Sequence, residues 1–284
     1  MPPKLAFSAN AYKRTDLKSA ISDISACGYQ ALEIFADVPH LYPLNTSPET
    51  INGVKESLRA KGMKVSNVNA FTMYRIGDTW RPSFLDRVLS LRQLRLDHTV
   101  AALEMAHSFN CATVSTEPGG PLEGSMSRDE ALDMFRNGLL EIIDRTTALD
   151  TMLLIEPEPG LLIETSHQME DFLDSMINPR IAVNLDVGHF FCVGEDPAEV
   201  IRRFTGRFDH VHMEDIAESR EHRHLVPGDG VMDFRSIMQA LSDIGYDGFV
   251  TIELYPYEEK PGQAARRALQ FLTPQWLDVY GENP

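Results

Sequence analysis

The sequence lacks long apolar runs, and this absence bears on membranes. No uninterrupted apolar stretch in its 284 residues approaches the roughly 18 residues that a transmembrane helix needs. The opening residues, MPPKLAFSANAYKRTDL, also lack the apolar run of a signal peptide. With 43% hydrophobic residues, the chain still has ample material for a large core. We therefore expect a cytoplasmic protein that does not enter a membrane.

Positive charge and cysteine are also scarce. The 26 basic residues face 42 acidic ones, which gives a formal net charge of -16. Binding to nucleic acid or to an anionic membrane needs a basic surface, so both partners are excluded, and the negative charge is expected to serve solubility. The three cysteines, Cys27, Cys111 and Cys192, form no CxxC pair. We expect free buried thiols in a reducing compartment.

What the chain does contain is a regular alternation of short β-rich runs and longer helical patterns. The helical patterns begin at capping residues such as Asp196, which precedes a proline, and Asp233. Parallel strands need crossovers of this kind, and eight such units favour a closed (β/α)8 TIM barrel over an open sheet. No linker divides the chain, so we expect one domain over residues 1–284. The expected strands are 5–10, 31–36, 64–71, 112–117, 152–158, 181–188, 210–215 and 249–255.

One connection is unusually long. Residues 72–86 (TMYRIGDTWRPSFLD), here called the long loop, follow the third expected strand and carry Tyr74, Arg75, Trp80 and Arg81. Long connections of this kind are often lids or binding loops, and surface decoration is the alternative.

Acidic residues and histidines gather at the ends of the last four strands. Strand side chains alternate between two faces, and in each of these strands Val, Ile and Leu occupy the face expected to meet the helices. The opposite parity sends Glu156, Asp186, a histidine and Glu253 toward the carboxyl end of the barrel, where TIM-barrel active sites lie. His212 is level with the others. His210 lies one step deeper, as a supporting or core residue, and Glu214 one step further out, against substrate or a loop.

Three carboxylates in a partly dry barrel mouth would repel one another, and a divalent cation would offset that charge. An oxygen-rich set with one nitrogen suits Mn²⁺ first, with Co²⁺, Mg²⁺ or Zn²⁺ as alternatives. The expected metal ligands are therefore Glu156, Asp186, His212 and Glu253.

These segments also resemble a known family. The motifs IEPE, NLDVGH, HVHMED and IEL, in that order and spacing, and HLVPGDGVMDF at 224–234, look like the xylose-isomerase-like TIM barrels. This family of sugar phosphate isomerases and epimerases includes ketose 3-epimerases and inosose isomerases. The resemblance implies the same four metal ligands. It also implies that His189 contacts a substrate oxygen, together with Arg223 or His224 from the loop after the seventh strand. Glu158 or Glu164 would be a further substrate-binding residue.

Such a site can remove a proton next to a carbonyl group. A metal that binds a ketone and its neighbouring hydroxyl acidifies the α-carbon, and Glu156 and Glu253 are the expected acid/base pair, acting through an enediolate. Return of the proton then gives an isomerase or epimerase of a keto sugar or related polyol. A lyase or dehydratase acting on an inosose or 3-dehydroshikimate-like substrate is the alternative, because it begins with the same step.

Two further alternatives are weaker. A three-zinc nuclease needs extra histidines on the early strands, which offer Asn67, Asn69 and Ser115 instead. A non-catalytic binding subunit has no reason to keep costly buried carboxylates. The expected partner is a small sugar-like molecule, and a homo-oligomer is possible. The sequence leaves Glu33 and Glu117 undecided, and it assigns surface or packing roles to His40, His98, His107, His167 and His222.

Overall fold

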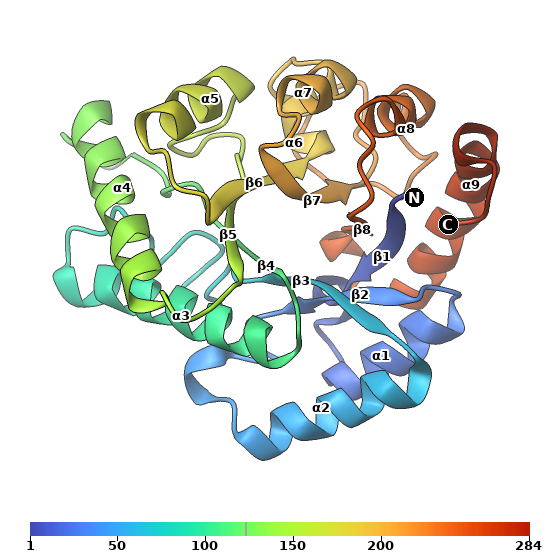
Figure 1. The fold of residues 1–284 in the computed structure, drawn as a ribbon, viewed down its shortest axis with the longest axis horizontal. Helices are drawn as coiled ribbons and strands as arrows, with labels where there is room; N and C mark the ends of the chain where they lie inside the picture. The colour runs from blue at the N-terminus through green and yellow to red at the C-terminus, as the bar shows by residue number, and fades with distance from the viewer. Residues whose placement is uncertain (123) are drawn as a thin grey trace.

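Eight parallel strands close into a barrel in the computed structural model, which describes residues 1–122 and 124–284. Each strand pairs with its neighbours in chain order, and β8 returns to β1. Figure 1 shows the helices arranged around these strands, with both chain ends on the same side as α9. The expected TIM barrel is therefore confirmed. The strands are β1 Lys4–Ser8, β2 Ala31–Phe35, β3 Lys64–Asn69, β4 Thr113–Thr116, β5 Met152–Ile155, β6 Ile181–Asp186, β7 Phe208–Met213 and β8 Phe249–Ile252.

The helices follow the capping signals in the sequence. Asp196 accepts a hydrogen bond from the N–H of Ala198 at the start of α7, where Pro197 is the first helical residue. Asp233 accepts from Ser236 at the start of α8, and Gly62 ends α2 with a left-handed φ of 65°. The α-helices are α1 Leu17–Ala26, α2 Pro48–Lys61, α3 Leu89–Ser108, α4 Arg128–Arg145, α5 Ser166–Ser175, α6 Val187–Cys192, α7 Pro197–Arg203, α8 Phe234–Asp243 and α9 Pro261–Tyr280. Three short 3-10 helices are η1 Ala9–Tyr12, η2 Pro43–Asn45 and η3 Tyr255–Tyr257.

Each strand ends one to three residues before its expected end, and the end of the sixth strand matters most. The strand expected over 181–188 ends at Asp186, because the Asp186 side chain accepts the N–H of His189 and starts helix α6. This earlier end affects the site, because Asp186 both ends a strand and caps a helix that carries His189.

The hydrophobic core lies between the strands and the helices. Val183, Leu185, Val211 and Val250 are fully buried on the outer face of the strands, as the alternation predicts. Each such side chain contributes about 1.5–3 kcal/mol relative to an exposed position. The inner face is polar instead, and register pairs Asp186 with His212 across β6 and β7.

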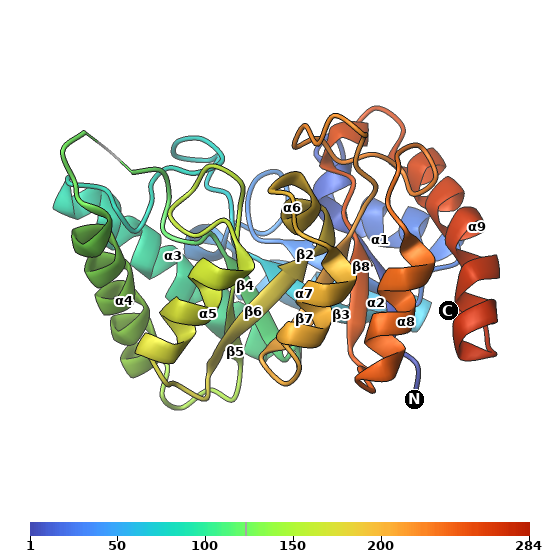
Figure 2. The same cartoon turned by 90° about the horizontal axis from the view of Figure 1, so that it is seen from above.

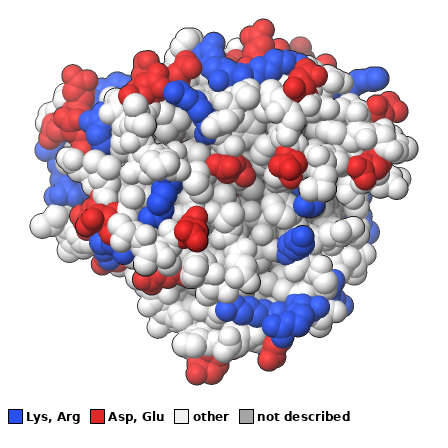
Figure 3. Space-filling view, in the orientation of Figure 1, with Lys and Arg blue, Asp and Glu red and all other residues white. Residues whose placement is uncertain are grey.

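Long connections lie at one end of the barrel (Figure 2), and the surface carries charges of both signs (Figure 3). Figure 2 shows that the connection carrying α6 stands at one end of the barrel, together with other long connections. On the face drawn in Figure 3, acidic and basic side chains are interspersed. None of the helices in the described part of the chain combines the length and apolar character that a membrane crossing requires. All three cysteines are free, and Cys27 and Cys111 are buried.

Candidate metal centre and active-site pocket

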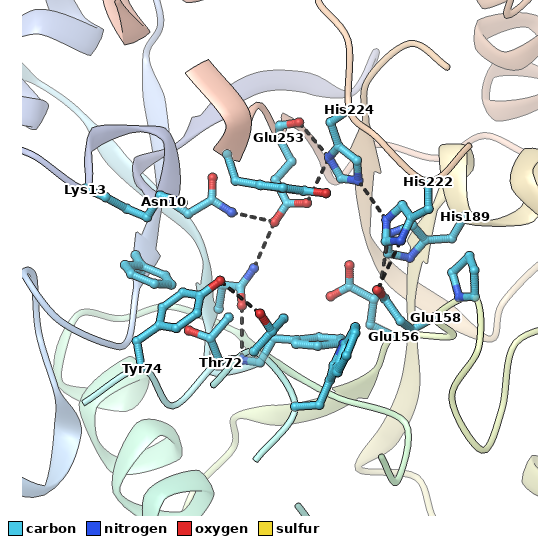
Figure 4. A pocket seen from close by; sticks show the side chains of 17 residues that line it. Asn10, Lys13, Thr72, Tyr74, Glu156, Glu158, His189, His222, His224 and Glu253 are labelled. Atoms are coloured by element: carbon cyan, nitrogen blue, oxygen red, sulfur yellow. Dashed lines mark hydrogen bonds and ion pairs between the residues drawn. The ribbon is translucent and has the colours of Figure 1, made fainter. Parts of the chain in front are cut away.

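A cavity of about 430 Å³ opens at the carboxyl end of the barrel (Figure 4). Its lining comes from the ends of β3, β5 and β8, from η1, and from the loops that follow β3, β5 and β7. The long loop supplies Tyr74 and Trp80, whereas Arg75 and Arg81 are not among the lining residues. The long loop therefore forms one wall of the cavity, and this wall is aromatic.

The four expected metal ligands lie together beneath this cavity. Glu156, Asp186, His212 and Glu253 each offer one ligand atom, and these atoms all lie within 4.8 Å of one another. His212 Nδ1 is 3.0 Å from Glu156 Oε1 and 3.8 Å from Glu253 Oε1. Its distance to Asp186 Oδ2 is also 3.8 Å. Four groups that could hold a metal ion therefore converge, as the sequence spacing predicted.

His212 is oriented by a carboxylate on the other side of its ring. Its Nε2 lies 2.7 Å from Glu33 Oε2, which leaves Nδ1 to face the quartet of expected ligands. Glu33 also accepts hydrogen bonds from Ser8 at 2.6 Å and Asn67 at 2.9 Å. A carboxylate that fixes a metal-ligating histidine in this way is a common feature of metal sites. The inward parity of Glu33 was visible in the sequence, but its pairing with a residue 179 positions away was not.

Glu253 is held by two asparagines. Asn10 Nδ2 donates to Glu253 Oε1 at 2.7 Å, and Asn69 Nδ2 donates to the same oxygen at 3.2 Å. Figure 4 shows Asn10 pointing at Glu253 across the cavity floor. Sequence reasoning missed Asn10 because asparagine is common in turns after strands, and here Asn10 lies inside η1, which Ser8 caps.

The buried carboxyl groups of this region have strongly shifted pKa values. Burial alone would raise the pKa of Glu33, but the neighbouring His212 outweighs burial and lowers that pKa to about 2. Burial, aided by the nearby carboxylates, raises the pKa of Glu253 well above its ordinary value despite the opposing effect of His212. Oε2 of Glu156 is buried and has no hydrogen-bond partner among the described residues. A divalent cation would offset the repulsion between the carboxylates, and it would bind the unpartnered buried oxygen. The residues therefore fit such an ion.

His210 and Glu214 lie beside the quartet. His210 bonds to Asn184 Oδ1 and Thr251 Oγ1, both at 2.7 Å, and burial lowers its pKa to about 3, so it is a neutral core histidine. Burial and the charge of Asp186 raise the pKa of Glu214 well above its usual range. Its carboxyl group packs against Gly188, where a Cβ atom would lie 1.8 Å from Glu214 Oε1. Glycine is therefore required at this close approach.

A second polar group forms the cavity wall next to β6 and β7. His189, His224 and Glu158, all expected to bind substrate, line the cavity. Burial alone would lower the pKa of His189, but Asp186 and Glu158 outweigh it and raise that pKa to about 9. Burial raises the pKa of Glu158 to about 8. Of the alternatives, Arg223 is exposed and absent from the lining, and Glu164 instead accepts the N–H of Gly160 at 2.9 Å.

Among the histidines assigned to the surface or to packing, His222 differs from the expectation. It lines the cavity beside His189 and His224, because the loop after β7 folds back over the barrel mouth. His40 and His98 are packing residues, since His98 Nε2 bonds to the carbonyl of Ala36. His107 and His167 are exposed.

Glu117, also undecided from the sequence, is structural. It is fully buried, lies 3.9 Å from the Arg95 guanidinium, and accepts N–H groups of Phe84 and Gly119. Asp37 has a similar role under the long loop, where it accepts the N–H groups of Tyr74 and Arg75 and the hydroxyl of Thr72. Both carboxylates hold connections that surround the cavity.

Comparison with known proteins identifies the family to which this barrel belongs. Residues 21–275 match the xylose isomerase-like TIM barrel, and the chain therefore belongs to that family. Among curated relatives, an inosose dehydratase of Lacticaseibacillus casei is 25% identical over 92% of this chain and 90% of its own length. Two solved structures share the fold. One is the IOLI protein with a bound zinc atom (TM-score 0.80, 18% identity, covering 98% of this chain and 100% of that one). The other is a D-psicose 3-epimerase with D-tagatose from Clostridium cellulolyticum (TM-score 0.78, 19% identity, 96% and 99%).

Proposed function

We propose that this protein is a divalent-metal-dependent isomerase or epimerase of a keto sugar or related polyol. The observation that carries the proposal is the quartet of Glu156, Asp186, His212 and Glu253, whose ligand atoms converge within 4.8 Å at the carboxyl end of the barrel. The family membership and the adjoining polar cavity support the same conclusion.

These four residues would hold the metal ion, and Mn²⁺ is the ion that we propose. Three carboxylates and one imidazole form a hard, oxygen-rich donor set without thiolates. Donor sets of this kind suit Mn²⁺. When bound, the ion would polarise a substrate carbonyl and acidify the neighbouring C–H group. Glu33 would keep His212 in the required orientation through the 2.7 Å contact to Nε2.

Two carboxylates of the quartet are available for proton transfer. Glu156 and Glu253 come from β5 and β8 and both face the cavity (Figure 4). Glu156 faces the cavity, and its carboxylate would take a proton from the substrate α-carbon. Glu253 Oε1 accepts hydrogen bonds from Asn10 and Asn69, and Oε2 lies 3.3 Å from His224 Nδ1. Held in this way, the carboxyl group of Glu253 would return a proton from another direction. Return to the same carbon from the other face gives an epimer, and return to the adjacent carbon gives an isomer.

The rest of the cavity suits a polyhydroxylated substrate. His189, Glu158 and His224 form a polar wall for substrate oxygens, and Tyr74, Trp80 and Tyr255 provide aromatic surfaces for the C–H faces of a ring. The long loop forms one wall of the cavity and would limit access of water to the reacting carbon from that side.

A dehydratase is the second candidate, and one observation favours it. The curated relative from Lacticaseibacillus casei is named an inosose dehydratase and aligns with 92% of this chain. A dehydratase would use the same proton abstraction by Glu156 or Glu253 and then lose a β-hydroxyl group as water. The substrates to test for this candidate are inososes and 3-dehydroshikimate.

The deciding experiment is proton NMR in D₂O with Mn²⁺-loaded protein and a panel of ketoses, inososes and 3-dehydroshikimate. Deuterium at the α-position together with a new isomer supports the main proposal, whereas a new alkene signal supports the dehydratase. A chelator-treated sample and the Glu156→Gln variant are the controls. Full turnover by Glu156→Gln with bound metal would contradict the role given to Glu156.

We further propose a single domain, a cytoplasmic location and a homo-oligomer. Free Cys27, Cys111 and Cys192 support a reducing compartment. Exposed apolar residues on and after the long loop, among them Ile76 and Leu89, would supply a contact between copies. Light scattering would test the oligomer, and a monomer at micromolar concentration would contradict it.

A further inference from the structure

One positively charged side chain lines a cavity that is otherwise rich in carboxylates. Lys13 is the one lysine or arginine among the described residues of the lining, which also includes Glu156, Glu158 and Glu253. The chain has 42 acidic and only 26 basic residues, so carboxylates are plentiful as partners for a lysine. Whether Lys13 has such a partner decides what it can bind.

The backbone on either side of Lys13 is anchored by residues outside the cavity. Nε2 of His40 lies 3.2 Å from the carbonyl oxygen of Tyr12 and 3.2 Å from that of Thr15. The hydroxyl group of Tyr12 also donates to Asp23 at 2.8 Å. Lys13 therefore extends into the cavity wall from a fixed turn after η1.

Two tyrosine rings flank the ammonium group of Lys13. Nζ lies 6.0 Å from the ring centroid of Tyr74 in the long loop and 5.8 Å from that of Tyr255 at the start of η3. An aromatic face attracts a lysine ammonium group electrostatically but leaves its positive charge in place. The two rings therefore orient the charge at the cavity wall without neutralising it.

No described carboxylate neutralises this charge. Across residues 1–122 and 124–284, the ammonium group of Lys13 makes no hydrogen bond or ion pair. The neighbouring Arg14 differs, because it pairs with Glu258 and Glu259, both at 3.3 Å. The acidic residues after η3 thus pair with Arg14 and leave the N–H donors of Lys13 available to a ligand.

The position of Lys13 suits a group at the far end of a bound substrate. Figure 4 shows Lys13 and His189 on opposite sides of the cavity, with Glu253 between them. We propose that Lys13 binds an anionic group, a carboxylate or a phosphate, that the substrate carries away from its reacting carbon. A lysine ammonium group donates strong charge-assisted hydrogen bonds to both. Resting on the proposed function, this assignment narrows the substrates from neutral sugars to keto-sugar acids and keto-sugar phosphates.

The test compares D-fructose with D-fructuronate and D-fructose 6-phosphate, which carry a carboxylate or a phosphate at one end of the same keto sugar. Full-length, Mn²⁺-loaded protein is titrated by calorimetry, and α-hydrogen exchange is followed by NMR in D₂O. We expect one of the anionic compounds to bind about 10–100-fold more tightly than D-fructose. Lys13→Met should abolish this preference. Lys4→Met should keep it, because Lys4 likewise lies over a ring, that of Phe249 at 5.8 Å, but outside the cavity.

The outcomes bear separately on Lys13 and on the proposed function. Equal or weaker binding of both anionic compounds by the wild type would overturn the anion subsite, and exchange at D-fructose would then leave the proposed function standing. A preference that persists in Lys13→Met would also overturn the subsite, because the anion would then bind elsewhere, for example at the metal ion. A preference lost in Lys13→Met, without exchange in any compound, would support the subsite and count against the proposed function. The tighter anionic compound shows whether the subsite takes a carboxylate or a phosphate.

Discussion

The contact between Glu33 and His212 makes a quantitative prediction about metal affinity. In Glu33→Gln, the side chain keeps its shape but loses the negative charge that faces His212 Nε2 at 2.7 Å. Both side chains are fully buried, so water cannot replace the lost interaction. Hydrogen bonds to charged groups contribute about 1.5–3 kcal/mol, and supporting carboxylates of this type typically change metal affinity by about 10–100-fold.

We therefore expect Glu33→Gln to weaken Mn²⁺ binding by about 10–100-fold, which corresponds to about 1.4–2.7 kcal/mol. Isothermal titration calorimetry on chelator-treated protein measures this directly. Glu117→Gln is the matched control, because it makes the same substitution at a second fully buried glutamate, which contacts Arg95 and not the quartet. Unchanged metal affinity in Glu33→Gln, or an equal loss in Glu117→Gln, would refute the role assigned to Glu33.

Three further predictions concern stability and the cavity walls. Gly188→Ala brings a methyl group into Glu214 and should destabilise the fold by about 1–3 kcal/mol. Gly53→Ala, where the added methyl group meets only the flexible end of a lysine, should not, and equal urea midpoints for the two variants would contradict this. Asp37→Asn removes one of the two acceptor oxygens beneath the long loop, so amide hydrogen exchange in that loop should accelerate while the barrel strands stay protected. Unchanged exchange would count against this role. Burial raises the pKa of Glu117 to about 7, so the folded state retains a proton that the unfolded state, with an ordinary pKa of about 4.3, releases. Stability should therefore fall as pH rises between about 4.5 and 7. This fall should be smaller in Glu117→Gln, and identical pH profiles would show that Glu117 does not cause it.

Much of the fold was predictable because its signals are local. The caps at Asp196 and Asp233 and the alternation in β5 to β8 each depend on a few adjacent residues. Local signals did not predict the boundary at Asp186. Its side chain accepts the N–H of His189, so α6 begins where the expected strand would have continued. The strand pattern extended equally well to residue 188, and only the competing hydrogen bond decided the boundary.

The candidate site also contains residues that the sequence predicted and residues that it did not. Glu156, Asp186, His212 and Glu253 were predictable, because strand parity and barrel closure bring the ends of consecutive strands together. His222 was not, because its position depends on how an irregular loop of the chain folds back over the barrel. The choice between Arg223 and His224 depended on that loop as well, and only His224 points inward.

The sequence by itself determined the barrel, the inward parity of the acidic residues and the histidine expected to join them, since these follow from period-2 alternation repeated over eight units. Only the tertiary structure decided which groups support that set. Glu33 meets His212 and Asn10 meets Glu253 across 179 and 243 residues of chain. Such contacts have no local signal, because they arise from barrel closure and from the paths of loops whose side chains pack against several elements at once.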